Sequence, residues 1–241
     1  MQSDDGARSA SPLWALPLLA GLLPAAATLA ALWLSIELGL MPSCNPLLDG
    51  CVSISRAARH DLPNHIFRAL VLPAAVLQGM TWMLCVAWLK GMETETRMQL
   101  RVLSWLGILA ALFLILYGTF LGTEGLAYRF MRRQGITFYF GFTYLCMVIA
   151  SGALWRLARA GLITLPARLD WLLPGLCAIT LLVGLTQVFV PQFLDSEDLK
   201  NRLENILEWY AGLSFTLFFL ALAWLWRHTR FTVQLSGNKR S

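Results

Sequence analysis

Residues 102–122 read VLSWLGILAALFLILYGTFLG, an apolar run that contains no charged side chain. A helix rises about 1.5 Å per residue, so ~20 such residues cross the ~30 Å hydrocarbon layer of a bilayer. Lipid offers no partners for backbone N–H and C=O groups, and a barrel would show short strands of alternating polarity instead. The run therefore predicts a transmembrane helix.

Other parts of the chain repeat this pattern. Charged residues make up only 14% of the 241 residues, against ~25% in a typical soluble protein, and they gather between the apolar runs or at their ends. The sequence predicts an all-α integral membrane protein, with one domain over 1–241 that is a six-transmembrane-helix bundle. The expected helices are 12–40, 66–89, 102–122, 136–157, 171–190 and 206–226.

The basic residues predict the orientation of this bundle. Six crossings put both termini on one side, which carries eleven Lys and Arg residues against eight on the other side. Positive residues favour the cytoplasmic side, so cytoplasmic N and C termini are expected. Residues 41–65 then form a non-cytoplasmic polar loop. The expected location is multi-pass in a cell or inner membrane of a prokaryote, or in an endomembrane of a eukaryote.

The cysteines and the net charge indicate no metal or nucleic-acid site. Cys44 and Cys51 share the polar loop, where an oxidising compartment would permit a disulfide, and two free thiols remain the alternative. The other three cysteines lie singly in apolar runs, where thiols behave as small hydrophobes. The net charge of +5 comes from scattered Lys and Arg residues without a basic stripe, which favours contact with anionic lipids over nucleic acid. No metal or cofactor is expected.

Ionic residues gather at the non-cytoplasmic ends of the predicted helices. Arginine can hold a phosphate through two hydrogen bonds, and a carboxylate at the edge of hydrocarbon is costly unless it is paired. Arg68 opens the second helix, and Glu208 is its natural counterpart. The expected lipid-headgroup residues are Arg56, Arg59, Arg68, Glu124, Glu204 and Glu208. A structural ion-pair network that fixes the register of the helices is the competing interpretation.

Catalysis is a second hypothesis. No G-x-S-x-G or H-E-x-x-H motif is present. His65 and Glu208 are the candidate general bases of an acyltransferase or hydrolase that would act on a membrane lipid. A third hypothesis is a non-catalytic partner that packs against another membrane protein or against a second copy of itself. The sequence leaves open whether the protein is an enzyme.

Three short segments resemble the Frag/DRAM/Sfk family. They are Ser53-Ile-Ser-Arg-Ala with Pro63 and Ile66-Phe67-Arg68, then Leu154-Trp155-Arg156-Leu157, and Ile206-Leu207-Glu208-Trp209. The resemblance implies a six-helix membrane domain like those of the GPI-anchor lipid-remodelling factor and the CWH-type N-terminal membrane domain. This chain has Arg132-Arg133-Gln134 where the family commonly has His followed by an acid, so the resemblance does not by itself imply the family's acid–base chemistry for this chain. The leading hypothesis is a protein that binds or handles membrane lipid at a headgroup site on the non-cytoplasmic face.

Overall fold

The computed structural model describes residues 13–92, 97–166 and 168–232, and this part of the chain is helical with no strand. Within these ranges six helices are long and apolar enough to cross a membrane, as predicted. They are α1 (Ala15–Glu37), α3 (Asp61–Gly91), α4 (Arg97–Phe120), α5 (Leu126–Arg159), α6 (Leu169–Phe189) and α7 (Glu197–His228). Two short helices, α2 (Ile54–Ala57) and the 3-10 helix η1 (Val190–Phe193), lie in the connections.

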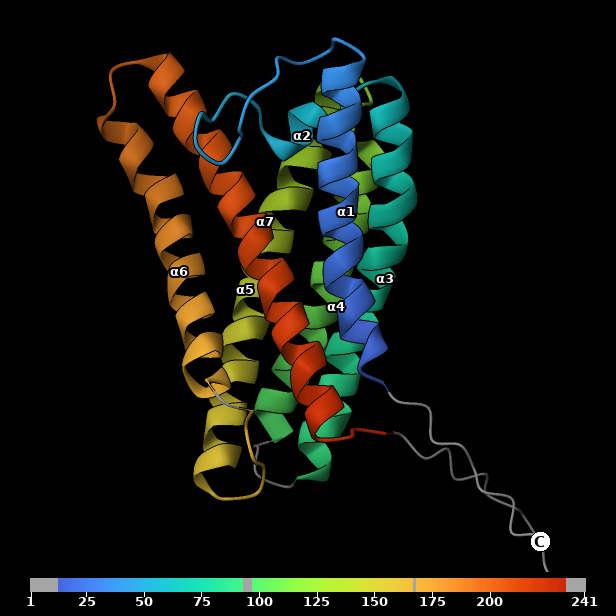
Figure 1. Ribbon diagram of the computed structural model, residues 1–241, viewed down its shortest axis with the longest axis vertical. Helices are drawn as coiled ribbons and strands as arrows, with labels where there is room; N and C mark the ends of the chain where they lie inside the picture. The colour runs from blue at the N-terminus through green and yellow to red at the C-terminus, as the bar shows by residue number, and fades with distance from the viewer. Residues whose placement is uncertain (1–12, 93–96, 167, 233–241) are drawn as a thin grey trace, which may run out of the picture.

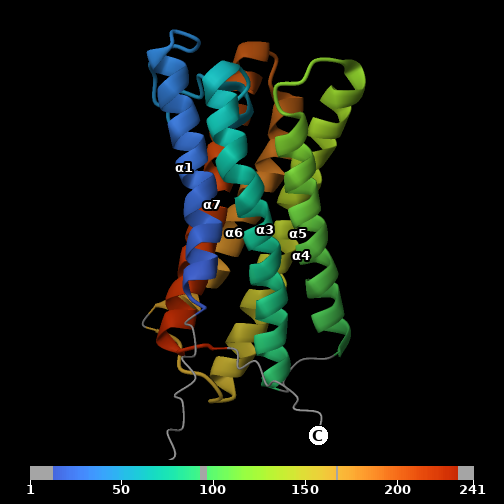
Figure 2. The same ribbon diagram turned by 90° about the vertical axis from the view of Figure 1, so that its right-hand side faces the viewer.

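The long helices stand side by side and form a ring. Each packs on the next in chain order from α1 through α3, α4, α5 and α6 to α7, and α7 packs back on α1 (Figures 1 and 2). The start of α1 and the end of α7 lie at the lower end in Figure 1, which we call the termini end. The opposite end holds α2, the loop before it and the α4–α5 and α6–α7 connections; we call it the disulfide end.

Three helices extend beyond their predicted starts at the disulfide end. Helix α3 begins at Asp61 and not at residue 66, α5 at Leu126 and not at 136, and α7 at Glu197 and not at 206. An apolar run marks only the part of a helix that lies in hydrocarbon, whereas polar turns can continue the helix into the headgroup region.

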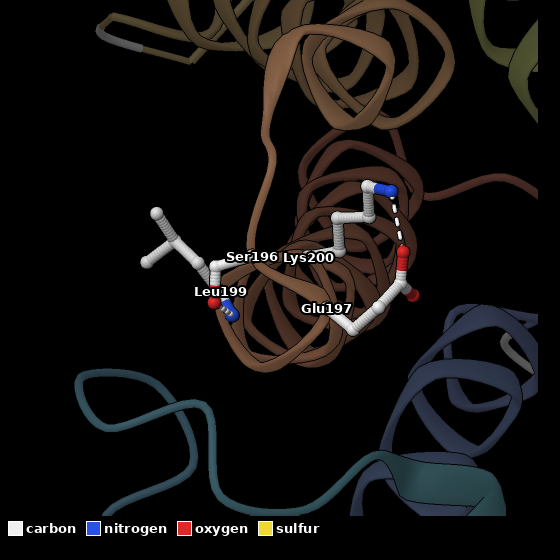
Figure 3. A network of polar contacts seen from close by, with 4 residues as sticks. All are labelled: Ser196, Glu197, Leu199 and Lys200. Atoms are coloured by element: carbon white, nitrogen blue, oxygen red, sulfur yellow. Dashed lines mark hydrogen bonds and ion pairs between the residues drawn. The ribbon is translucent and has the colours of Figure 1, made fainter.

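The first turn of α7 shows how such a polar extension is stabilised. The Ser196 side chain accepts a hydrogen bond from the Leu199 N–H, and Lys200 Nζ lies 2.6 Å from Glu197 Oε1 (Figure 3). The serine satisfies one of the free N–H groups of the first turn, and the ion pair joins residues on one helix face.

Small and aromatic residues build the interior of the ring. Ala20, Ala27 and Ala31 of α1 are fully buried. The buried Trp82 of α3 contacts the rings of Phe218 and Phe219 of α7, with centroids 6.0 and 5.4 Å apart. Close packing of this kind is what joins helices in lipid, because apolar side chains gain little there by leaving the lipid itself.

Candidate functional site

The loop between α1 and α2 is fixed against the start of α7. Cys44 and Cys51 form a disulfide in this loop. Gly50 has a φ of +60° and lies so close to α7 that a Cβ atom there would overlap the Arg202 carbonyl oxygen. Only glycine satisfies both conditions, so the loop and the helix approach each other as closely as their backbones allow.

Three side chains from one face of α7 hold the backbone of this loop. Asn205 Nδ2 donates to the Gly50 carbonyl at 2.7 Å, and Trp209 Nε1 donates to the Val52 carbonyl at 2.9 Å. Glu208 Oε1 accepts a hydrogen bond from the Ser55 N–H at 3.2 Å. Positions 205, 208 and 209 share a helix face. The loop backbone therefore runs along this face of α7 and is hydrogen-bonded to it.

Helix α2 is held at both of its ends. The Ser53 hydroxyl accepts a hydrogen bond from the Arg56 N–H at 3.1 Å and caps the first turn. At the other end, the Ser35 hydroxyl of α1 donates to the Ala57 carbonyl at 2.6 Å. A four-residue helix has little stability of its own, so these contacts determine where Arg56 lies.

The segment that carries Arg59 is anchored next to α4. Asn64 Nδ2 donates to the Ala58 carbonyl at 2.9 Å and to the Leu121 carbonyl at 3.1 Å. Gly122 has a φ of +85°, and a Cβ atom there would lie 2.6 Å from the Arg59 carbonyl oxygen. The backbone of Arg59 is therefore fixed between α3 and the end of α4.

Near these contacts, several ionic groups and one phenol lie within electrostatic reach of one another. Tyr117 of α4 is 2% exposed, and its hydroxyl has no hydrogen-bond partner within the described residues. This hydroxyl is within electrostatic reach of Glu208, Arg132 and Arg59. Glu208 is partly buried and within reach of both Arg59 and Arg56. We call Arg56, Arg59, Tyr117, Arg132 and Glu208 the Tyr117 cluster.

Positive charge dominates the surroundings of Arg59. Its Nε atom is buried and has no hydrogen-bond partner in the part of the chain that the structure describes. Burial and the neighbouring charges of Arg132 and Arg56 lower the pKa of Arg59. A guanidinium still keeps its proton at physiological pH, so the crowding favours a bound anion over loss of the proton.

A small cavity lies beneath the cluster inside the ring. Its volume is about 60 Å³, and its walls are mostly apolar side chains from α1, α3, α4, α5 and α7. Tyr117 and Glu208 contribute to the lining, and so do Gln78 and Tyr139. Tyr139 donates its hydroxyl proton to Gln78 Oε1 at 3.1 Å, and Gln78 Nε2 donates to the Ala20 carbonyl at 3.0 Å. At about 10–15 Å³ per water, the cavity holds a few small polar molecules but no acyl chain.

The structure brings together half of the predicted headgroup residues. Arg56, Arg59 and Glu208 belong to the Tyr117 cluster. Glu124 is exposed in the α4–α5 connection, and Glu204 is exposed on α7, where it reaches Glu208 only electrostatically.

Arg68 is placed differently from the expectation. The cations that act on Glu208 are Arg59 and Arg56, not Arg68. Helix α3 starts at Asp61, and its buried face runs through Phe67 and Val71. Successive residues are about 100° apart around a helix, so Arg68 lies at the edge of this face, where it is partly exposed.

The proposed catalytic bases do not meet a nucleophile. His65 is exposed on α3, and among the described residues no hydrogen bond joins it to Ser53 or Ser55. The hydroxyls of these two serines lie 3.2 Å from each other. One oxygen of Glu208 already accepts the Ser55 N–H. The arrangement supports binding of a charged group better than acyl transfer.

Sequence reasoning missed Arg132 and Tyr117. Arg132 was named only where the chain departs from the Frag/DRAM/Sfk pattern and was not expected at the site, because the helix was expected to start at residue 136. The buried face of α5 passes through Gly135, Tyr139 and Thr143, and Arg132 continues it at helical spacing. That periodicity is the signal that could have revealed Arg132. Nothing in the apolar run around Tyr117 distinguishes its hydroxyl.

The chain matches no protein-family model, no curated protein and no solved structure. The resemblance to the Frag/DRAM/Sfk family therefore stays a prediction. The candidate site is supported by the contacts and burial described above.

Proposed function

We propose that this protein binds the phosphate-bearing headgroup of a membrane lipid at the Tyr117 cluster. The observation that carries the proposal is the pair of buried donors, Arg59 Nε and the Tyr117 hydroxyl, which lack partners among the described residues. Each such donor costs about 1–3 kcal/mol. A phosphate oxygen would accept hydrogen bonds from both donors and would offset the charges of Arg56 and Arg132.

A lipid fits the surroundings of the cluster better than a free anion does. Tyr117, Arg132 and Glu208 of the cluster lie on helices that are long and apolar enough to cross a membrane, and α6 exposes Leu182, Val188 and Phe189. The interior cavity is too small for an acyl chain. The headgroup would therefore enter the cluster while the chains stay in the bilayer along the outside of the bundle.

Glu208 acts in this proposal as a positioning residue. Its hydrogen bond to the Ser55 N–H ties α7 to the first turn of α2, which carries Arg56. Its charge also offsets part of the repulsion between Arg56 and Arg59. The carboxylate thus lets two arginines share one site before a lipid arrives.

The disulfide end would face the non-cytoplasmic side. Disulfides persist in oxidising compartments and are rare in the cytosol, and Cys44 and Cys51 are bonded at this end. The side of the termini, with the terminal segments included, carries eleven Lys and Arg residues against eight on the other side, which also favours cytoplasmic termini. Reporter fusions at either terminus test this orientation, and a terminus found outside the cytoplasm would refute it.

Lipid retention measured by native mass spectrometry tests the headgroup site. Arg59→Gln combined with Arg132→Gln should lower the amount of co-purified phospholipid by about tenfold, because charge-assisted hydrogen bonds are lost. Arg133→Gln is the matched control, since Arg133 is the exposed neighbour of Arg132. Equal retention by the double variant and the control would refute the proposal.

Tyr117→Phe separates binding from a purely structural role. The substitution removes only the unpaired hydroxyl, so a structural role predicts a protein of equal or greater stability with unchanged lipid content. Lipid binding predicts equal or greater stability with less retained lipid. Lipidomics of a deletion strain tests the enzymatic alternative. An altered acyl composition of the membrane lipids would indicate an enzyme, whereas an altered distribution of lipids between the leaflets requires no chemical reaction.

A further inference from the structure

A second pocket opens above the Tyr117 cluster. It lies between the loop that contains the Cys44–Cys51 disulfide and the start of α7. Its volume is about 350 Å³, several times that of the interior cavity. In contrast to that cavity, its lining is mostly polar and ionic: Asp49, Arg56, Asp198, Asn201, Arg202 and Asn205. We call it the outer pocket.

The walls of the outer pocket are held in place before any ligand binds. The disulfide closes the loop on one side. The Gly50 backbone lies directly on Arg202, and Asn205 Nδ2 donates to the Gly50 carbonyl at 2.7 Å. Asp49 Oδ2 accepts a hydrogen bond from the Asn45 N–H at 2.9 Å, which fixes its carboxylate. Because the backbone of the pocket is fixed, little backbone entropy is lost when a ligand binds.

The charges in this pocket balance. Two carboxylates, Asp49 and Asp198, face two guanidiniums, Arg56 and Arg202, within one cavity. Arg202 Nε lies 3.0 Å from Asp198 Oδ2, so this pair partly neutralises itself. Asp49 and Arg56 offer the remaining opposite charges. Such a lining complements a ligand that carries a positive and a negative group a short distance apart.

Arg56 connects the outer pocket with the Tyr117 cluster. It lines the outer pocket and is also within electrostatic reach of Glu208 in the cluster. A phosphate bound at Arg56 would therefore lie at the boundary between the two. Whatever is esterified to the polar side of that phosphate would project into the outer pocket.

We propose that the outer pocket receives the amine of a zwitterionic phospholipid headgroup, of the phosphoethanolamine class, with the ammonium group on Asp49 and Asp198 and the phosphate on Arg56. The inference rests on the proposed function and adds the headgroup class to it. An anionic lipid such as phosphatidylglycerol would satisfy Arg56 but would bring no cation to Asp49, because Arg202 pairs with Asp198.

Competition between two lipids tests this inference. The full chain is reconstituted in nanodiscs that hold equal amounts of phosphatidylethanolamine and phosphatidylglycerol with matched acyl chains, and retained lipid is quantified after extraction. Wild type should prefer phosphatidylethanolamine by about fivefold or more, as expected for two solvent-accessible ion pairs. Asp49→Asn with Asp198→Asn should bring the ratio close to one. Thermal unfolding shows whether this variant is folded.

Two further variants give the outcomes distinct meanings. Asp195→Asn is the matched control, because Asp195 is an exposed acid near the start of α7 that does not line the pocket. It should keep the wild-type preference. Arg59→Gln should lower retention of both lipids equally, since it changes the phosphate site alone.

The possible failures can be told apart. If the Asp49/Asp198 variant keeps the preference, or if wild type shows none, while Arg59→Gln still lowers both lipids, then the headgroup assignment is wrong and the proposed function stands. If Arg59→Gln retains both lipids fully, the proposed function fails as well. Tight binding of soluble sn-glycero-3-phosphoethanolamine without any retained lipid would assign the pocket to a soluble phosphoamine and overturn the lipid assignment.

Discussion

Arginines occur at both ends of the bundle, but the two ends use them differently. At the termini end, the guanidinium carbon of Arg159 lies 4.1 Å from the centroid of the Trp155 ring, and that of Arg227 lies 5.4 Å from the Trp14 ring. At the disulfide end, Arg59 is partly buried among other cations. The first arrangement suits the surface of a membrane. In the second, the repulsion between neighbouring cations favours a bound anion. The same residue type thus stacks on aromatic rings at one end and forms a candidate site at the other.

The backbone around each set of arginines explains the difference. Arg159 and Arg227 are exposed in the last turns of their helices, where their long side chains can reach and stack on a nearby aromatic ring. Arg59 lies in a connection held by Asn64 and by the close approach of Gly122. A fixed backbone keeps the charge at the site even though its neighbours repel it. The disulfide end should therefore be the more rigid of the two.

The largest expected effect comes from Gly122→Ala. This change combines a positive φ with a Cβ atom 2.6 Å from the Arg59 carbonyl oxygen, so the free energy of unfolding should fall by about 3 kcal/mol or more. Gly161→Ala at the termini end is the matched control, because Gly161 has a φ of +71° but nothing within 4 Å of its added Cβ. It should lose about 1–2 kcal/mol. Unfolding in detergent measures both, and equal losses would show that the segment around Arg59 is not tightly packed.

Removal of the Cys44–Cys51 disulfide should have the next largest effect. Cys44→Ser with Cys51→Ser opens a short loop, for which loop-closure entropy predicts a loss of about 2 kcal/mol. Reductant should destabilise wild type by a similar amount and leave the double variant unchanged, as measured by thermal unfolding. Wild type that unfolds identically with and without reductant would contradict the rigid loop.

A smaller effect is expected for Trp209→Phe. The variant keeps an aromatic ring but loses the 2.9 Å hydrogen bond to the Val52 carbonyl, so about 1–2 kcal/mol of stability should be lost. Trp224→Phe on the same helix is the control, because Trp224 is 47% exposed and should change stability by less than about 0.5 kcal/mol. If both variants behave alike in thermal unfolding, α7 does not hold the loop through this bond.

The smallest effects are expected at the termini end. Arg159→Gln and Arg227→Gln each remove a cation–π contact, which should cost less than about 1 kcal/mol and leave lipid retention unchanged. Comparison with Arg59→Gln in the native mass spectrometry assay checks this. A loss of phospholipid as large as that of Arg59→Gln would mean that any positive charge on the bundle retains lipid, and the two ends would no longer differ.

Local composition was sufficient to predict the helices and part of the site. Each apolar run such as 102–122 became a long helix, because lipid leaves the backbone no alternative. Arg56, Arg59 and Glu208 were also expected to act together, because charged side chains at the edge of hydrocarbon are costly unless they are paired with opposite charges. The helix starts were predicted too late, because polar turns at the bundle end look like loops in a hydropathy pattern.

Local composition did not predict which of α6 and α7 is buried in the bundle. Both helices contain an apolar stretch long enough to cross a membrane. In the structure α7 packs in the core and holds the loop through Asn205, Glu208 and Trp209, whereas residues of α6 such as Leu182 face outward. Hydropathy cannot separate the two, since lipid and protein interior are equally apolar.

The sequence by itself determined that this chain has six helices long and apolar enough to cross a membrane and that its scarce charges gather near the helix ends. Only the tertiary structure decided which of those charges lie near one another, because they come from α2, the α2–α3 connection, α4, α5 and α7. Their approach depends on backbone contacts such as Gly122 against Arg59 and Gly50 against Arg202. Spacing along one helix reports a shared face, but it carries no information about which neighbour that face will contact.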